Sequence, residues 1–287
     1  MGSASIHTAV QAPRSGSPMP GRKSRSSRRA ANPLLAALVG CMQQMAVVLS
    51  IFVLWEIGVR LGFIDGNLVP PPTKVLAALV DLARMGLLWT DVKASVMRVV
   101  VGFIIASVIA ISLATLLARW RALAKYVMPV IELVRPISVI AWIPLAILWF
   151  GLGDKPAWFI IFLGSFFPIF TNTYLGIRSV QPIHVQAAQC LGAGRWLFVR
   201  KVLFPSALPY ILAGMRVGLG VGWMCVIAAE LIAATSGLGY MIQLARTLIE
   251  TEKVLAGMIV IGIIGFAMNH FMSWLERKLT PWSHQDA

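Results

Sequence analysis

Six long hydrophobic segments, nearly free of charged side chains, dominate the sequence. Five stretches of 18 to 22 residues contain no Asp, Glu, Lys or Arg, and a sixth is interrupted only by Arg216 and Glu230. A helix that crosses the hydrocarbon core of a bilayer needs about 20 mostly apolar residues. The segments therefore predict an all-α polytopic membrane protein with six transmembrane helices. The predicted spans are 34–56, 97–118, 127–150, 157–177, 208–234 and 254–275.

The composition agrees with a membrane protein. Hydrophobic residues make up 58% of the chain and charged residues 13%, whereas soluble domains are about half apolar and a quarter charged. This balance excludes a soluble enzyme with one core, and it excludes a disordered chain, which requires low hydrophobicity. The formal net charge of +14 would suggest a nucleic-acid partner for a soluble protein. In so hydrophobic a chain we attribute it to membrane topology and expect no nucleic acid.

The placement of the basic residues predicts the orientation. Fifteen of the 25 Lys and Arg residues lie in the tail before the first span, in the second and fourth connections, or after the last span. Six lie in the connections on the opposite side, and the remaining four lie within or at the ends of spans. Because cytoplasmic loops carry an excess of Lys and Arg, both termini are predicted to be cytoplasmic.

The two ends of the chain are predicted to be tails. Residues 1–33 contain six basic residues, no acidic residue, seven serines and four prolines, a composition that cannot bury a core and predicts a disordered cytoplasmic tail. Residues 283–287 form a short C-terminal tail. The sequence from Leu38 to Cys41 resembles a lipoprotein cleavage box, but the apolar run continues past Cys41 and favours a membrane anchor.

The connection between the first two spans contains a predicted helix over 74–85. Three prolines, 70–72, precede it, and proline is tolerated in the first turn of a helix, where its missing N–H costs nothing. The spacing predicts an amphipathic helix along the outer interface. Its expected apolar face is Val75, Leu76, Leu79 and Leu82.

Motifs for catalysis and for metal binding are absent from the sequence. There is no phosphate-binding loop, because no glycine precedes a lysine. The four histidines are scattered, and the three cysteines are isolated from one another, so neither a metal site nor a disulfide framework is expected. We therefore expect a protein that is not an enzyme and that holds no cofactor of its own.

The fourth connection, 178–207, carries more hydrophobic surface than a solvated linker needs. Pro182 is expected to start a short helix, the Gly192–Gly194 turn to end it, and a second helix to run toward Pro205 beneath the membrane. One interpretation is a helix-turn-helix element that docks on a cytoplasmic partner. The alternative is a basic loop that only sets topology. The apolar positions are Ile183, Ala187, Cys190, Leu191, Trp196, Val199, Val202 and Leu203.

This connection resembles the EAA loop of ATP-binding-cassette (ABC) importer permeases. The resemblance rests on Gln186-Ala187-Ala188, on Gly192 after three further residues, and on Val202-Leu203-Phe204-Pro205. It implies a coupling helix that sits in a groove of a separate ATPase subunit. Gln186 stands where the family usually has Glu, which keeps the hydrogen-bonding shape without the charge. The residues implied to couple to the ATPase are Gln186, Ala187, Ala188, Gly192, Ala193, Gly194, Arg195 and Pro205.

Three further segments, 141–153, 228–240 and 279–282, resemble the nitrate, sulfonate and taurine branch of these importers. The resemblance covers about residues 50–282 and implies a type I importer permease in the bacterial inner membrane. Its implied partners are the lipid bilayer, a second copy of the chain, two ATPase subunits that bind ATP and Mg, and a periplasmic substrate-binding protein. Taurine or another alkanesulfonate is the expected cargo, with nitrate or another small anion as the alternative. A secondary transporter that works alone is a further alternative, but it leaves the docking loop unexplained.

Polar residues within the spans are candidates for the translocation path. Glu132 and Arg135 are three residues apart and are expected to share a helical face and to pair. Arg216 is expected to pair or to reach the interface, although a guanidinium also suits an anionic cargo. Glu230 is expected either to brace the 235–240 turn or to line the external gate. Weaker path candidates are Trp142, Pro144, Phe166, Phe167 and Pro168.

Three glycines of the fifth span, Gly214, Gly218 and Gly222, repeat every four residues. This spacing predicts a smooth ridge for close contact with another helix. The family resemblance implies that the ridge lies at a pore or dimer interface. Packing within the chain is the alternative.

Overall fold

The structure is a computed structural model that describes residues 50–63, 65–66, 68–180, 183, 186, 188, 190–192 and 194–284. The chain divides into two units, 1–51 and 52–287, and the account below concerns the second. The predicted tail 1–33, the Leu38–Cys41 segment, most of the predicted span 34–56 and residues 285–287 lie outside the described residues.

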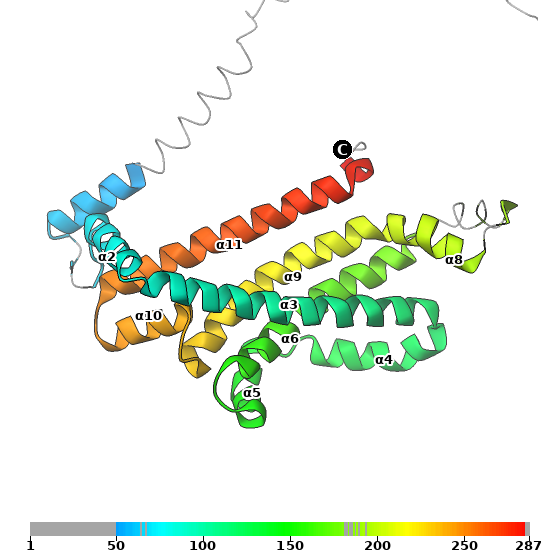
Figure 1. Ribbon diagram of the computed structural model, residues 1–287, viewed down its shortest axis with the longest axis horizontal. Coiled ribbons are helices and arrows are strands. Elements are labelled where there is room, and N and C mark those ends of the chain that lie inside the picture. The colour runs from blue at the N-terminus through cyan, green and yellow to red at the C-terminus, as the bar shows by residue number, and fades with distance from the viewer. Residues whose placement is uncertain are drawn as a thin grey trace, which may run out of the picture. The chain divides into compact units, whose positions relative to one another are not determined.

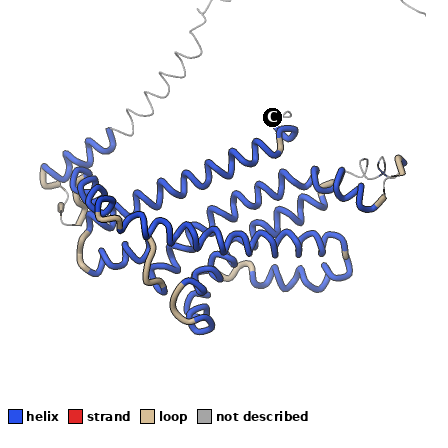
Figure 2. The backbone as a smooth tube through the Cα atoms, viewed as in Figure 1, coloured by secondary structure: helices blue, strands red, loops and turns tan. Residues whose placement is uncertain are grey.

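Helices make up the described part of the chain, which contains no strand (Figures 1 and 2). The predicted all-α class is confirmed. The α-helices are α2 Pro72–Arg84, α3 Leu87–Arg119, α4 Arg121–Val134, α5 Ile143–Phe150, α6 Asp154–Arg178, α8 Arg195–Phe198, α9 Phe204–Ala233, α10 Leu238–Thr247 and α11 Thr251–Leu279. The other helical segments are 50–60, the 3₁₀ turns η1 Val139–Trp142 and η3 Pro281–His284, and the π-helix η2 Val199–Leu203.

Four helical segments in the described residues are long and apolar enough to cross a membrane: α3, α6, Val199–Ala233 and α11. A bent pair, Arg121–Val134 with Val139–Phe150, brings the number to five if it forms one span. Five of the six predicted spans therefore have counterparts here.

The predicted span over 127–150 corresponds to this bent pair rather than to one straight helix. α4 begins at Arg121 and ends at Val134, and the chain turns by 90° before the helix resumes at Val139. Figure 1 shows α5 turned away from α4. Pro136 accounts for the break, because its ring lacks an N–H and clashes with the preceding turn of a helix. Apolar composition alone does not reveal this interruption.

α2 confirms the amphipathic helix predicted between the first two spans. It begins at Pro72, and Val75 and Leu82 are buried. Leu76 is 59% exposed and therefore lies outside the part of this apolar face that packs on the protein. Leu76 follows Val75 directly, and successive residues point about 100° apart around a helix.

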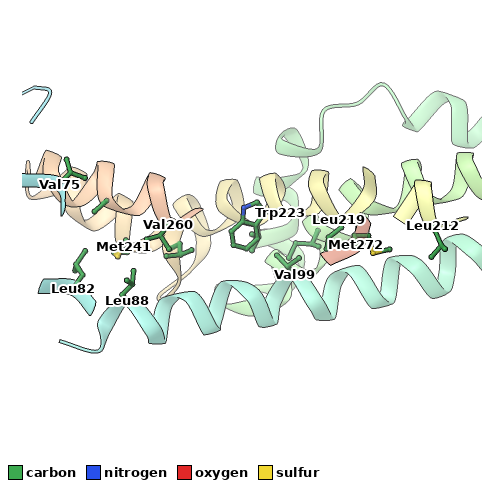
Figure 3. Close-up of a cluster of buried hydrophobic side chains, with 14 residues drawn as sticks. Val75, Leu82, Leu88, Val99, Leu212, Leu219, Trp223, Met241, Val260 and Met272 are labelled. Atoms are coloured by element: carbon green, nitrogen blue, oxygen red, sulfur yellow. The ribbon is translucent and has the colours of Figure 1, made fainter. Parts of the chain in front are cut away.

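The core lies where α3 and α9 pack against α6. α10 and α11 pack against α9 and each other, and α2 packs against α11 and α3. One buried cluster joins Val75 and Leu82 of α2 to Val99, Trp223 and Val260, and Figure 3 shows these side chains between the helices. A second cluster centres on Phe166, Phe170 and Tyr174 of α6, whose rings stack along the helix. These contacts fix the ends of the helices that carry the polar groups described next.

Candidate functional site

A buried polar cluster lies where α6 begins and α9 ends, at the end of the bundle predicted to face outward. We call Asp91, Ser95, Arg98, Asp154, Glu230 and Ser236 the Arg98 cluster. Arg98 is 5% exposed and Glu230 is 1% exposed. Burying a charge is costly unless it is paired and hydrogen-bonded. The cluster meets this requirement with contacts from four parts of the chain.

Arg98 is the centre of the cluster. Its Nε donates to Asp154 Oδ1 at 2.6 Å, and its Nη1 donates to Glu230 Oε1 at 2.7 Å. The same Nη1 donates to the carbonyl oxygen of Ser236 at 2.6 Å, and Nη2 donates to Ser236 Oγ at 2.9 Å. One guanidinium thereby connects α3 to α6, α9 and the segment that follows α9.

Glu230 receives three further contacts besides Arg98. Ser95 Oγ lies 2.8 Å from each carboxylate oxygen, and the backbone N–H of Gly239 donates to Oε2 at 2.9 Å. Ser95 Oγ also accepts from the N–H of Leu238 at 2.9 Å. The carboxylate is thus held against the start of α10. Two roles were considered for Glu230, and these contacts fit the first, a brace for the 235–240 turn.

The turn itself depends on Gly237. Its φ of +112° is one that side-chain-bearing residues rarely adopt, and a Cβ there would collide with the Glu230 carboxylate. Its N–H donates to Asp91 Oδ1 at 2.8 Å. Asp91 and Gly237 are 146 residues apart in the sequence, so this contact follows only from the fold.

The glycine ridge of α9 packs within the chain, against α6. A Cβ added at Gly214 would lie 2.7 Å from Asn172 Cβ, and one at Gly218 would lie 2.8 Å from Ile169 Cγ1. At Gly222 it would lie 2.6 Å from Ser165 Oγ. The ridge therefore faces a neighbouring helix of the same chain. This corrects the implied pore or dimer surface and selects the alternative.

Arg216 pairs with Glu276 of α11 at 3.2 Å. The pair links α9 to α11, and the Arg216 side chain remains 42% exposed. Arg216 precedes Glu230 by 14 residues on α9, about 21 Å along the helix. The two charged groups of this span therefore belong to different sites.

The other path candidates are not gathered into one site. The predicted Glu132–Arg135 ion pair is wrong: within the described residues neither side chain forms one, and both are exposed. Arg135 caps α4 with helical φ and ψ, and its N–H donates to Ile131 O, so the two residues share the last turn without forming an ion pair. Trp142 is half-buried with its ring edge toward Phe159, and Pro144 is exposed in the first turn of α5.

The proposed docking segment is described only in part. Ala187, Ala193 and the side chain of Arg195 lie outside the described residues. Gln186 is exposed and Ala188 is buried, and Gly192 has a φ of +67°, which suits a turn that ends a helix. Leu191 and Trp196 are 86% and 76% exposed. Two large apolar side chains on either side of this turn therefore face outward.

The second helix of this segment is not separate from the fifth span. Residues 195–233 are helical without interruption, through α8, the π-helix and α9. Pro205 lies in the first turn of α9, directly after the π-helix. The predicted helix beneath the membrane is thus the beginning of the spanning helix itself.

Sequence reasoning missed most of the Arg98 cluster. It treated Arg98 as a charge at the end of a span and gave no role to Ser95, Asp154 or Ser236. The available signal was Glu230, because a carboxylate at membrane depth requires a cationic partner in the protein interior. Four arginines within or at the ends of spans were candidates, and only the fold selects Arg98.

Comparisons with known proteins agree with this architecture. Residues 106–283 match the family described as binding-protein-dependent transport system inner membrane component. The taurine transport system permease protein TauC of Escherichia coli K12 is 37% identical over 255 residues, which cover 87% of this chain and 92% of the relative. The putative aliphatic sulfonates transport permease protein SsuC of Bacillus subtilis is 32% identical, and the matched region covers 85% of this chain and 88% of the relative.

Two more distant proteins extend the comparison. The bicarbonate transport system permease protein CmpB of Synechococcus elongatus is 31% identical over 84% of this chain and 90% of its own length. An inward-facing structure of the MetNI methionine ABC transporter superposes with a TM-score of 0.61, over 69% of this chain and 98% of that one. The sequence identity with MetNI is 19%, so this likeness concerns the fold.

These findings confirm the family resemblance inferred from the EAA-like segment. They also confirm that the chain is a transport subunit rather than an enzyme, since the relatives are transport permeases. The chain belongs to the family of binding-protein-dependent transport system inner membrane components, the permease subunits of ABC importers.

Proposed function

We propose that this chain is the membrane-spanning subunit of an importer for taurine or another alkanesulfonate. The observation that carries the proposal is the 37% identity with the taurine permease over 87% of the chain. Relatives named for aliphatic sulfonates and for bicarbonate support a small solute with an anionic group. Nitrate is the other small anion that the resemblance implies.

The chain works with proteins that supply energy and capture the solute. A second copy completes the path, two ATPase subunits bind ATP and Mg, and a periplasmic binding protein delivers the cargo. Both termini lie in the cytoplasm and the spans lie in the inner membrane. The excess of basic residues in the connections on one side supports this orientation.

The proposed coupling runs along one helix. An ATPase that moves the 182–203 segment would push on residues 195–233, whose 39 residues are helical without interruption and span about 58 Å at 1.5 Å per residue. The far end of this helix carries Glu230, which the Arg98 cluster ties to α3 and α6. A displacement at the docking segment would therefore reach the opposite end of the bundle without an intervening loop.

Arg135 is the better candidate for contact with the cargo. Its side chain is exposed and, in the described part of the chain, carries no ion pair, whereas Arg216 is engaged by Glu276. A free guanidinium suits the planar or tetrahedral oxygens of a small anion. Glu132, Trp142 and Pro144 remain candidates for the same stretch of the path.

The test is taurine uptake into proteoliposomes that contain this chain, its ATPase and its binding protein. Uptake is expected to require ATP, and excess alkanesulfonate is expected to compete better than nitrate or bicarbonate. Arg135→Gln should lower uptake more than Arg216→Gln. Uptake without ATP or ATPase would contradict the proposal and favour a secondary transporter. Equal uptake by wild type and Arg135→Gln would remove Arg135 from the path.

A separate experiment tests whether the docking segment binds the ATPase, by substituting exposed side chains. Leu191→Glu is expected to abolish capture of the ATPase, because a charge replaces an apolar contact at a side chain that is 86% exposed. Leu152→Glu is the matched control, since Leu152 is 73% exposed in the turn before α6 on the opposite predicted side. Capture that survives Leu191→Glu would place the ATPase contact elsewhere.

A further inference from the structure

A groove of about 750 Å³ lies apart from the Arg98 cluster and shares Val199 and Leu203 with the docking segment. Its walls come from three helical segments: the end of α3, the last turn of α6 and the π-helix. The apolar wall includes Ile111 and Leu116 of α3, Ile177 of α6, and Val199 and Leu203 of the π-helix. A ligand that fills this groove must therefore present hydrocarbon to most of its surface.

One end of the groove is positively charged. Arg119 is the charged residue among those that line it. The walls continue into further exposed basic residues, which are Arg121 and Lys125 beyond α3, Arg178 beyond Ile177, and Arg200 and Lys201 beside Val199. No acidic residue occurs in 92–131 or 155–229. The sequence around the groove therefore favours an anion and offers no opposing charge.

The apolar lining continues onto the surface of α3. Ile104, Ile105 and Val108 are 53%, 42% and 61% exposed, and they precede the groove on the same spanning helix. An uncharged, exposed face on a spanning helix is suited to contact with acyl chains. Ser112 and Thr115 introduce hydroxyl groups before the basic end is reached. Along α3 the surface thus changes from hydrocarbon to hydroxyl to guanidinium, in the order in which a phospholipid changes from chain to headgroup.

We propose that the groove binds an anionic phospholipid of the cytoplasmic leaflet. One acyl chain lies against Ile111, Leu116 and Leu203, and the phosphate lies beside Arg119. A free inorganic anion would not use the apolar walls, and a zwitterionic lipid would gain less from the basic end. The proposal rests on the predicted orientation of the helices and is independent of the cargo and of the ATPase.

The π-helix gives this site a link to the rest of the molecule. Val199 and Leu203 belong both to the groove and to the segment that joins residues 195–198 to α9. π-Helical segments are rare and frequently occur at functional sites. A lipid packed against these two side chains stabilises the π-helical form and resists its rearrangement.

The experiment uses the purified full-length chain in detergent, incubated with phosphatidylglycerol or with phosphatidylcholine. Retained lipid is counted by native mass spectrometry. Phosphatidylglycerol is expected to be retained preferentially, and Arg119→Gln is expected to lower its retention about fivefold, the loss of one basic contact at the membrane surface. Arg119→Lys should keep most of the retention because it keeps the charge.

Ser112→Trp tests the apolar part of the site by filling the groove. Its control is Ile263→Trp, on the exposed surface of α11 outside the groove, and Arg246→Gln is the control for charge. Phosphatidylglycerol retention should fall in Ser112→Trp and stay at the wild-type level in both controls. Size-exclusion chromatography checks that each variant is folded and reports its oligomeric state.

Three results would overturn the proposal. They are equal retention of the two lipids, equal loss in Ser112→Trp and Ile263→Trp, and a Ser112→Trp variant that loses dimerisation while retaining lipid. The last result would assign the groove to a second copy of the chain. Because the measurement needs neither transport nor ATP, failure of the lipid site and failure of the proposed import function are distinguishable.

Discussion

At the scale of single residues, Arg98 donates four hydrogen bonds, to Asp154, Glu230 and Ser236. Its guanidinium is shared between Glu230, which is buried, and Asp154, whose side chain is 55% exposed. The two pairs are not equivalent. Water can solvate Asp154 when Arg98 is removed, whereas Glu230 would keep only Ser95 and the N–H of Gly239. The stability effect of Arg98 should therefore come mainly from Glu230.

Arg98→Gln is expected to destabilise the protein by about 3–5 kcal/mol, the cost of leaving a buried charge without its partner. Asp154→Asn should cost about 1 kcal/mol or less, because exposed ion pairs contribute little. Thermal unfolding of the detergent-purified chain measures both effects. The double variant Arg98→Gln/Glu230→Gln should be more stable than the sum of the two single losses indicates. Additive losses would show that the two residues do not interact.

The glycines of α9 offer a second residue-scale comparison. Gly218→Ala is expected to destabilise by about 1–3 kcal/mol, because its Cβ would overlap Ile169 of α6. Gly220→Ala, on the open side of the same helix, is expected to stabilise by up to about 1 kcal/mol, since alanine favours the helix and nothing lies near the new Cβ. Unfolding midpoints of the two variants should move in opposite directions. Movement in the same direction would contradict the α6–α9 packing.

At the scale of elements, the sequence predicted where helices occur better than where they are interrupted. The apolar periodicity of α2 and the length of the charge-free runs located most helices, because both reflect burial in an apolar medium. Pro136 and Pro205 lie in similar apolar surroundings, yet the first accompanies a 90° bend and the second follows a π-helix within a continuous run. Proline identity alone does not decide between a bend and a π-helix, since packing against the neighbouring helices determines which of the two forms.

The π-helix before Pro205 is expected to set the rotation of α8 relative to α9. Pro205→Ala restores a backbone N–H and allows an ordinary α-helix, which would rotate residues 195–198 by about 100°. Under the proposed function, ATP hydrolysis would continue while taurine transported per ATP falls. Pro209→Ala, inside α9 beyond the π-helix, is the control and should keep the wild-type ratio. Unchanged coupling in Pro205→Ala would mean that this rotation is not used.

At the scale of the whole molecule, the sequence revealed the fold class and the family but not the Arg98 cluster. The charge-free runs and the EAA-like segment are local, and each can be read within about 30 residues. Ser95, Asp154 and Glu230 meet only because α3, α6 and α9 pack at one end. The Glu132–Arg135 prediction failed for the converse reason: local spacing places both residues on the last turn of α4, but their exposed side chains form no ion pair within the described residues.

The orientation of the molecule can be tested with its own cysteines. Cys190 is exposed in the proposed cytoplasmic docking segment, and Cys225 is buried in α9. In a Cys41→Ser background, a membrane-impermeant maleimide is expected to label inverted vesicles at Cys190 and to leave intact spheroplasts unlabelled. Cys190→Ser is the control and should abolish labelling. Labelling of spheroplasts at Cys190 would reverse the predicted topology.

The Arg98 cluster also has a consequence for biosynthesis. Arg98 precedes Glu230 by 132 residues, so at about 5–20 residues per second it enters the membrane roughly 7–26 s before its buried partner has been translated. For much of that interval Asp154 is already available to Arg98, but the buried carboxylate of Glu230 is missing. Chains arrested just before Glu230 should be degraded faster than chains arrested after Gly239, which pulse-chase labelling can measure. The same ion pair that joins the finished helices thus also marks the moment at which translation has delivered enough of the chain to close the bundle.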